Sequence, residues 1–137
     1  MIHTPSKRPT RIAVVDDDTV FLGMMVELMQ GEGYEATAIK GSAQAYERLK
    51  ALRHDLVILD VRMGGEEAGW QVLDLLKRDP TTSHISMIAC SAAIGSLRER
   101  ADTLRQYDVR AVEKPFDVQD LLGQIEDALC QAPPPPP

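Results

Sequence analysis

Side chains that can bind metal or phosphate stand directly after four of the apolar runs in this sequence. Asp16 and Asp17 follow the first of these runs, and Asp60, Ser91 and Lys114 follow three later ones. Carboxylates that meet at one place repel one another unless a cation neutralises them. Magnesium (Mg2+) suits such a group best, because it takes one or two carboxylates, keeps several waters and completes its octahedron with phosphate oxygens. A hydroxyl and an ammonium facing the same spot could bind the remaining oxygens. The pattern therefore favours phosphoryl chemistry, with an aspartate as the nucleophile.

Each of these residues also has an ordinary structural explanation. An aspartate after a strand is usually a turn former or a helix cap, and we assign Asp18 to that role. An acidic triplet alone is most often a solvated loop, and Ser91 or Lys114 alone would carry almost no signal. Their joint placement after four separate runs is what favours a shared site. Pro115 strengthens this interpretation, because a proline can rigidify the turn that aims Lys114.

The elements that must position these residues alternate along the chain. Short apolar runs predict strands at residues 12–15, 36–39, 56–59, 85–90 and 109–112. Helical spacing of apolar residues follows each run, at Phe21, Met24, Met25 and Leu28, at Tyr46, Leu49 and Leu52, at Val72, Leu73 and Leu76, at Ile94, Leu97, Ala101 and Leu104, and at Val118, Leu121, Leu122, Ile125 and Leu129. Ser42 and Asp117 are placed to cap the second and fifth of these helices.

Five strand–helix cycles with short connections predict an α/β fold. They imply right-handed crossovers and a parallel sheet that is covered by helices on both faces. In such sheets, ligands bind outside the carboxyl ends of the strands, near the switch in strand order. The residues that could bind metal or phosphate are all predicted to lie at that edge.

Composition limits the class of protein. The chain has 137 residues, a net charge of −6 and 44% hydrophobic residues, which predicts one compact domain and argues against a nucleic-acid-binding surface. No apolar run approaches the ~20 residues of a membrane span, and the first ten residues lack the apolar core of a secretory signal. We therefore expect a cytoplasmic protein without a membrane anchor. Cys90 and Cys130 lack metal-site or redox spacing, so both are expected to be reduced and mostly structural.

The two ends of the chain differ from its centre. Residues 1–10 are predicted to be a flexible leader, and residues 11–132 the folded domain. Prolines fill positions 133–137 and favour an extended, polyproline-type segment. This segment is expected to be either a tail or a linker to a further part of a longer chain.

Four motifs taken in order resemble the receiver domain of two-component response regulators, the CheY-like superfamily. They are the acidic pair at 16–17, Asp60 in "LVILDVRM", the hydroxyl residue in "CSA" and "KPF" before the last helix, and the similarity covers about residues 11 to 130. The resemblance implies a flavodoxin-like three-layer sandwich, with a five-stranded parallel sheet in the order 2-1-3-4-5 and five helices. It also implies a phosphoacceptor signalling domain of a phosphorelay rather than an enzyme, with at most slow autodephosphorylation.

The resemblance also implies roles for individual residues. Asp60 would accept a phosphoryl group from a phosphohistidine. Asp17 and Asp60 would ligate Mg2+ directly, Asp16 would act through water, and the backbone carbonyl of Arg62 would complete the protein ligands. Ser91 and Lys114 would contact the phosphoryl oxygens and respond to phosphorylation.

The implied partners are proteins. The phosphoryl donor would be a sensor histidine kinase or a histidine phosphotransfer protein. The signal would pass to a downstream protein target or to an output domain missing from this sequence, with no direct contact to nucleic acid or membrane. The face formed by the fourth helix, the fifth strand and the fifth helix would be the partner surface, and possible homodimers would form through it.

Three departures from the family pattern affect how the signal is read out. Gly64 stands where the family usually has proline, and the loop "GGEEAG" at 64–69 is one residue longer than the common one. Ala111 occupies the position of the usual aromatic switch residue, so the inward swing of a ring is unavailable. Ser91 in place of threonine changes little. We therefore expect readout through the loop after Asp60 or through the fourth helix.

Two competing functions remain. "VVDDDTV" also matches the strand-end pattern of haloacid-dehalogenase-like phosphatases, in which Asp16 would be the nucleophile and Asp18 the acid/base. Against this, the chain lacks a cap domain and a clear later acidic pair, and the pattern gives Asp60 no role. The other alternative is a receiver-like binding module that is never phosphorylated.

The remaining unusual residues have ordinary interpretations. His54 and His84 flank predicted strands and are expected at the surface or at a boundary. Trp70 and the methionines at 24, 25 and 29 are expected to be core or helix-interface residues.

Overall fold

The computed structural model describes residues 9–63, 67–93 and 95–131. The predictions for the leader before residue 9, for residues 64–66 of the loop after Asp60, for Ile94 and for the proline run at 133–137 lie outside these described residues.

Five parallel strands form one sheet in the order β2-β1-β3-β4-β5, which confirms the predicted topology. The strands are β1 (Arg11–Asp16), β2 (Glu35–Lys40), β3 (Leu56–Asp60), β4 (Ser86–Ser91) and β5 (Arg110–Glu113). The central strands β1, β3 and β4 are buried along almost their whole length, as their unbroken apolar runs predicted. All the carboxyl ends of the strands therefore meet at one edge of the sheet.

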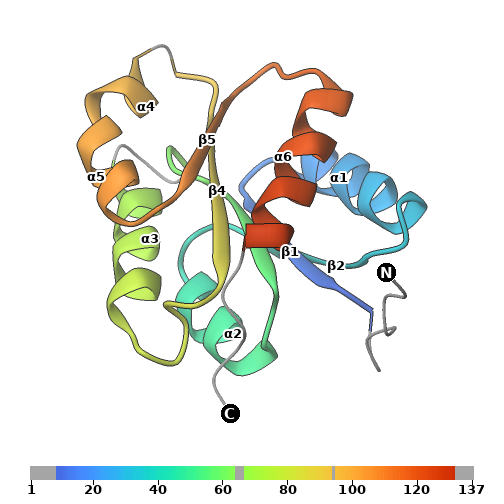
Figure 1. Cartoon of the computed structure of the whole chain (residues 1–137), viewed down its shortest axis with the longest axis horizontal. Helices are drawn as coiled ribbons and strands as arrows, with labels where there is room; N and C mark the ends of the chain where they lie inside the picture. Colours follow the sequence, from blue (N-terminus) through green and yellow to red (C-terminus); the bar gives the residue numbers. More distant parts are fainter. Residues whose placement is uncertain (1–8, 64–66, 94, 132–137) are drawn as a thin grey trace.

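Helices cover both faces of this sheet and complete the three layers (Figure 1). They are α1 (Thr19–Gly31), α2 (Ala45–Leu52), α3 (Ala68–Arg78), α4 (Ser96–Glu99), α5 (Ala101–Gln106) and α6 (Val118–Gln131). Successive residues of a strand point to opposite faces, and they therefore join different cores. Val14 packs in the cluster that contains residues of α1 and α6, whereas Val15 packs in the cluster that contains residues of α2 to α5.

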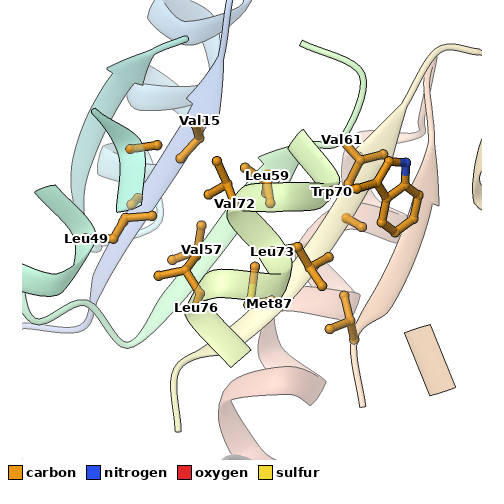
Figure 2. Packing of buried hydrophobic residues seen from close by; sticks show 14 of the residues in the cluster. Val15, Leu49, Val57, Leu59, Val61, Trp70, Val72, Leu73, Leu76 and Met87 are labelled. Atoms are coloured by element: carbon orange, nitrogen blue, oxygen red, sulfur yellow. The ribbon is translucent and has the colours of Figure 1, made fainter. Parts of the chain in front are cut away.

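The first turn of α3 lies directly against the end of β3. Figure 2 shows Trp70 of this turn beside Val61, the residue that follows Asp60. Gly69 makes the contact possible, because a Cβ atom there would lie only 2.4 Å from the Cα atom of Val61. The backbone of α3 is thus fixed close to Asp60, and only glycine fits at this point.

The region predicted as one fourth helix is divided in two. Helices α4 and α5 are separated at Arg100, whose backbone angles (φ −109°, ψ 22°) are not those of a continuous α-helix. The described residues therefore contain six helices where five were predicted. Leu97 and Leu104 are still buried, so the break keeps the apolar face that the spacing predicted.

The apolar face of α1 largely follows the predicted spacing, because Phe21, Met25 and Leu28 pack against the core. Leu22, Met25 and Met29 face the core, and Met24 is 53% exposed, so the expectation that Met24 belongs to the core is wrong. The prediction that Ser42 caps α2 is also wrong. The residue before this helix is Gln44, and its side chain forms no capping hydrogen bond.

Other local predictions are confirmed. The carboxylate of Asp117 accepts hydrogen bonds from the backbone N–H groups of Gln119 (2.8 Å) and Asp120 (3.1 Å) in the first turn of α6. Trp70 is buried.

The expectation that His54 lies at the surface or at a boundary is wrong. Its side chain is buried, and Nε2 lies 3.1 Å from Oγ1 of Thr37 on β2. A polar ring can be buried there because a hydroxyl from a neighbouring strand satisfies one of its nitrogens.

Within the described part of the chain, no helix has both the length and the apolar character that crossing a bilayer requires.

Candidate functional site

The candidate site lies at the carboxyl edge of the sheet, where β1, β3, β4 and β5 end. In the strand register, Asp60 stands opposite Cys90, and Ser91 opposite Glu113. One further backbone hydrogen bond extends the ladder, from the N–H of Lys114 to the carbonyl of Ser91 (2.9 Å). The sheet itself therefore fixes the order of the predicted site residues along this edge.

Three carboxylates gather at this edge. One oxygen from each of Asp16, Asp17 and Asp60 lies within 4.8 Å of the other two. The Asp16 side chain is 2% exposed and that of Asp60 is 13% exposed, whereas Asp17 is exposed. The sequence therefore correctly predicted that aspartates from two strands meet.

The two inner carboxylates are held by the same local device. Oδ1 of Asp16 accepts the backbone N–H of Asp18 (3.0 Å), and Oδ1 of Asp60 accepts the backbone N–H of Arg62 (2.9 Å). Each bond spans two residues and closes a tight turn at the strand end. Both carboxylates are thus oriented by their own backbone, with Oδ2 of each turned to a shared neighbour, Lys114.

Asp18 caps α1, as predicted. Its Oδ1 accepts the N–H groups of Val20 (3.0 Å) and Phe21 (3.2 Å) in the first turn. The acidic triplet therefore divides into two residues of the carboxylate group and one helix cap.

Lys114 is the cation of the site. Its Nζ lies 2.6 Å from Oδ2 of Asp16 and 3.4 Å from Oδ2 of Asp60. Burial favours the neutral amine and by itself would lower the pKa of Lys114, but the hydrogen bond to Asp16 and the charges of Asp60 and Asp16 outweigh burial and raise that pKa. Lys114 thus stays an ammonium and partly offsets the carboxylates.

An aromatic pair that the sequence did not identify as part of the site borders Lys114. Nζ of Lys114 lies 4.0 Å from the ring centroid of Phe21, and this ring meets Phe116 edge to face at 6.1 Å. Phe21 had been assigned to the apolar face of α1. The available signal was its position in the first turn of the helix that begins at the carboxylates.

Ser91 and Cys90 are adjacent but differ chemically. Ser91 is 1% exposed, and its Oγ accepts the backbone N–H of Ala93 (3.0 Å), which leaves the hydroxyl hydrogen available for donation. Burial above all raises the pKa of the Cys90 thiol to about 12, and the charges of Asp60 and Asp16 add to this effect. Cys90 is therefore a buried, protonated core residue.

An ion pair joins the end of the loop after Asp60 to the junction of α4 and α5. Glu67, the residue before α3, pairs with Arg100, and the distance between Oε1 and Nη2 is 2.5 Å. The guanidinium of Arg100 lies 4.9 Å from the ring centroid of Trp70. Ala111 on β5, the position of the usual aromatic switch residue, is exposed. Its methyl group cannot form an aromatic contact like that between Arg100 and Trp70. Arg100 thus links the first turn of α3 to the α4–α5 junction.

The three carboxylates fit a hard divalent cation. They are close together, they come from two strand ends, and oxygen is the ligand atom that Mg2+ prefers. This edge therefore carries an acidic aspartate cluster whose oxygens could ligate Mg2+.

Comparisons with known proteins agree with this geometry. A family model described as "Response regulator receiver domain" matches residues 12–126. "Protein PetR" of Rhodobacter capsulatus is 31% identical over 128 residues, covering 93% of this chain and 52% of PetR. "Polar-differentiation response regulator DivK" of Brucella anthropi is 26% identical over 125 residues, covering 90% of this chain and 99% of DivK. The chain thus spans about half the length of PetR and nearly all of DivK.

The fold also has solved counterparts. A "response regulator receiver domain protein (CheY-like)" from Methanospirillum hungatei JF-1 superposes with a TM-score of 0.77. Its sequence is 23% identical, and the match covers 90% of this chain and 96% of that one. At this identity the likeness supports the fold alone.

Proposed function

The chain belongs to the response regulator receiver domain family, and on this basis we propose that Asp60 accepts a phosphoryl group from the phosphohistidine of a partner protein. The observation that carries the proposal is the surroundings of Asp60. Its Oδ2 lies 3.4 Å from the ammonium of Lys114, and oxygens of Asp16 and Asp17 lie within 4.8 Å of its carboxylate. A cation and two further carboxylates thus border one partly accessible carboxylate.

In the proposed transfer, a carboxylate oxygen of Asp60 attacks the phosphorus atom of the donor. A phosphorus–oxygen bond forms while the phosphorus–nitrogen bond breaks, and the imidazole nitrogen leaves with the electron pair of that bond and is protonated. The N–H of Arg62 already fixes the Asp60 carboxylate, so the nucleophile is oriented before the donor arrives.

Four groups would hold Mg2+ in this proposal. The carboxylates of Asp17 and Asp60 and the backbone carbonyl of Arg62 would bind it directly, and Asp16 would bind it through water. The bound ion would supply positive charge that stabilises the phosphoryl oxygens.

Lys114 and Ser91 would bind the phosphoryl oxygens after transfer. A phosphoryl group on Asp60 adds strong acceptor oxygens and negative charge. The ammonium of Lys114 already lies between Asp16 and Asp60, and it can donate to one of these oxygens. The hydroxyl of Ser91 can donate to another, because its Oγ accepts a hydrogen bond but keeps its own hydrogen.

The phosphatase alternative is less well supported. It needs Asp16 as the nucleophile, yet the Asp16 side chain is only 2% exposed, against 13% for Asp60, and it holds the closer contact with Lys114, at 2.6 Å against 3.4 Å. It also needs Asp18 as the acid/base, yet the Asp18 carboxylate caps α1. The family match and these contacts together favour Asp60.

Receiver domains are signalling domains, and response regulator receivers interact with histidine kinases or phosphotransfer proteins. The signal of this chain would pass through protein contacts, to a separate target or to an output domain. Because Ala111 carries no ring, the rearrangement would start at the Glu67–Arg100 contact and reach the face that α4, α5, β5 and α6 form, where a second copy could also bind.

The test is phosphorylation by acetyl phosphate in the presence of magnesium chloride, followed by mass spectrometry of the intact protein. The wild type should gain one phosphoryl group, and Asp60→Asn should gain none. Asp127→Asn is the matched control, because Asp127 is an exposed aspartate on α6. It should be labelled like the wild type.

Two results would contradict the proposal. If Asp16→Asn removed a catalytic phosphatase activity that Asp60→Asn retained, the chain would be a phosphatase. If the wild type neither took up the label nor bound Mg2+, it would be a binding module that is never phosphorylated.

A further inference from the structure

The first turn of α1 brings an aromatic ring to the cation of the site. Asp18 caps the helix and accepts the N–H of Phe21, so the backbone of Phe21 is fixed next to the carboxylates. The Phe21 ring centroid lies 4.0 Å from Nζ of Lys114, well within the about 6 Å over which a cation is attracted to an aromatic ring. The Lys114 side chain is only 17% exposed, so little water competes for its charge.

The Phe21 ring is also contacted by a residue that is close to Lys114 in the sequence. Phe116, two residues after Lys114, meets Phe21 at an interplanar angle of 76°. Helices α1 and α6 lie on the same face of the sheet (Figure 1). Both rings pack against the core on that face. The Lys-Pro-Phe turn and α1 thus fix the ring and the ammonium relative to each other.

Lys114 needs such a constraint because its contacts are unequal. Its ammonium is 2.6 Å from Asp16 but 3.4 Å from Asp60, so the stronger ion pair draws it away from the carboxylate that is to be phosphorylated. An ammonium on a flexible four-carbon stem has no preferred direction of its own. The ring of Phe21 is a third attraction, which does not depend on either carboxylate.

We propose that Phe21 is a positioning residue for Lys114, whose ring holds the ammonium where it can meet the phosphoryl oxygens on Asp60. The inference rests on the proposed phosphorylation of Asp60 and deepens it by assigning a role to a residue outside the family motifs. Without the ring, Lys114 is expected to stay on Asp16, and phosphoryl transfer to Asp60 should slow.

The test replaces Phe21 with phenylalanines that carry one, two and more ring fluorines. Fluorine weakens the negative face of the ring but changes its size little, so packing is largely preserved. The labelling rate of Asp60 by acetyl phosphate should fall stepwise with fluorination, to roughly two- to fivefold below wild type. The matched control places the same fluorinated residues at Tyr34, a partly buried ring of the same core beyond the other end of α1, and should leave the rate nearly unchanged.

Ordinary substitutions give a second measurement. Phe21→Leu should slow labelling, and Phe21→Tyr, which keeps an aromatic face, should restore it. In NMR spectra, the methylene protons next to Nζ of Lys114 should be shifted upfield by the ring in the wild type and in Tyr34→Leu, but not in Phe21→Leu.

The outcomes separate this inference from the proposed function. If the wild type is labelled on Asp60 but the labelling rate does not change with fluorination at Phe21, or changes equally with fluorination at Tyr34, the positioning role is overturned and the receiver function stands. If wild type is not labelled, the proposed function fails, and the positioning role fails with it.

Discussion

On each face of the sheet a cation lies over an aromatic ring, and the Lys114–Phe21 and Arg100–Trp70 contacts differ in burial. On the α1–α6 face, Lys114 meets Phe21 and pairs with Asp16, whose side chain is 2% exposed. On the opposite face, Arg100 meets Trp70 and pairs with Glu67, and the two charged side chains are 36% and 59% exposed. An ion pair shielded from water holds its geometry firmly, whereas an exposed pair contributes little and is easily broken.

The helices near the two contacts also differ in length. The α1–α6 face is covered by helices of 13 and 14 residues, whereas Arg100 stands between helices of 4 and 6 residues. Short helices have few internal hydrogen bonds and depend on their packing. The comparison indicates that the Lys114 contact is the more rigid of the two, and we expect any rearrangement to begin at the Arg100 contact.

The largest effect is expected from removing the buried cation. Lys114→Met leaves the Asp16 carboxylate buried without its partner, so without magnesium the free energy of unfolding should fall by about 3 kcal/mol in urea melts. Labelling of Asp60 should also be lost. Arg100→Met removes the exposed cation and should cost less than about 1 kcal/mol. Equal losses in the two variants would contradict the comparison.

The ion pairs of Lys114 should stop stabilising the fold at alkaline pH. The pKa of Lys114 is raised in the folded protein, so its stabilising contribution is complete below the ordinary lysine pKa of about 10.4 and is lost as pH rises through the folded value. Urea melts of wild type and Lys114→Met should therefore converge above that pH. A difference that stays constant would show that the charge of Lys114 does not stabilise the fold.

The third prediction concerns the close contact between α3 and the end of β3, on the same face as Arg100. Gly69→Ala places a methyl group 2.4 Å from the Val61 backbone, so α3 must shift and the free energy of unfolding should fall by about 1–3 kcal/mol. Gly123→Ala is the matched control, because nothing lies within 4 Å of a Cβ on that glycine of α6. It should stabilise by about 0.5–1 kcal/mol.

The smallest energetic effect is expected from the exposed pair itself. Arg100→Gln removes the ion pair with Glu67 and should change stability by less than about 1 kcal/mol. Its effect should appear instead in hydrogen exchange. Phosphorylation of the wild type should alter amide protection most in residues 95–107 and least in α1, and Arg100→Gln should alter residues 95–107 before any phosphorylation. Changes concentrated in α1 would reverse the roles of the two faces.

The sequence was most informative where structure is local. Strand ends could be predicted because unbroken apolar runs stop at Asp16 and Asp60, and parallel strands must bring such ends together. The strand order, in contrast, was implied only by resemblance to a family. The roles of Asp18 and Asp117 as caps were predictable because a cap binds only its own first turn.

The missed features depend on residues that are distant in sequence. His54 is buried because Thr37 of another strand satisfies it, and Phe21 joins the site because Lys114 comes to lie against it. The break at Arg100 was hidden because Leu97 and Leu104 keep helical spacing across it, and no glycine or proline lies between them.

Trp70 is the only tryptophan in the chain, and it lies under Arg100. Intrinsic tryptophan emission therefore originates from one face of the sheet. A change in its intensity on phosphorylation would report the Arg100 contact and would be insensitive to Lys114. The fold thus contains its own optical probe, which would report a change at the Arg100 contact in real time without an added dye.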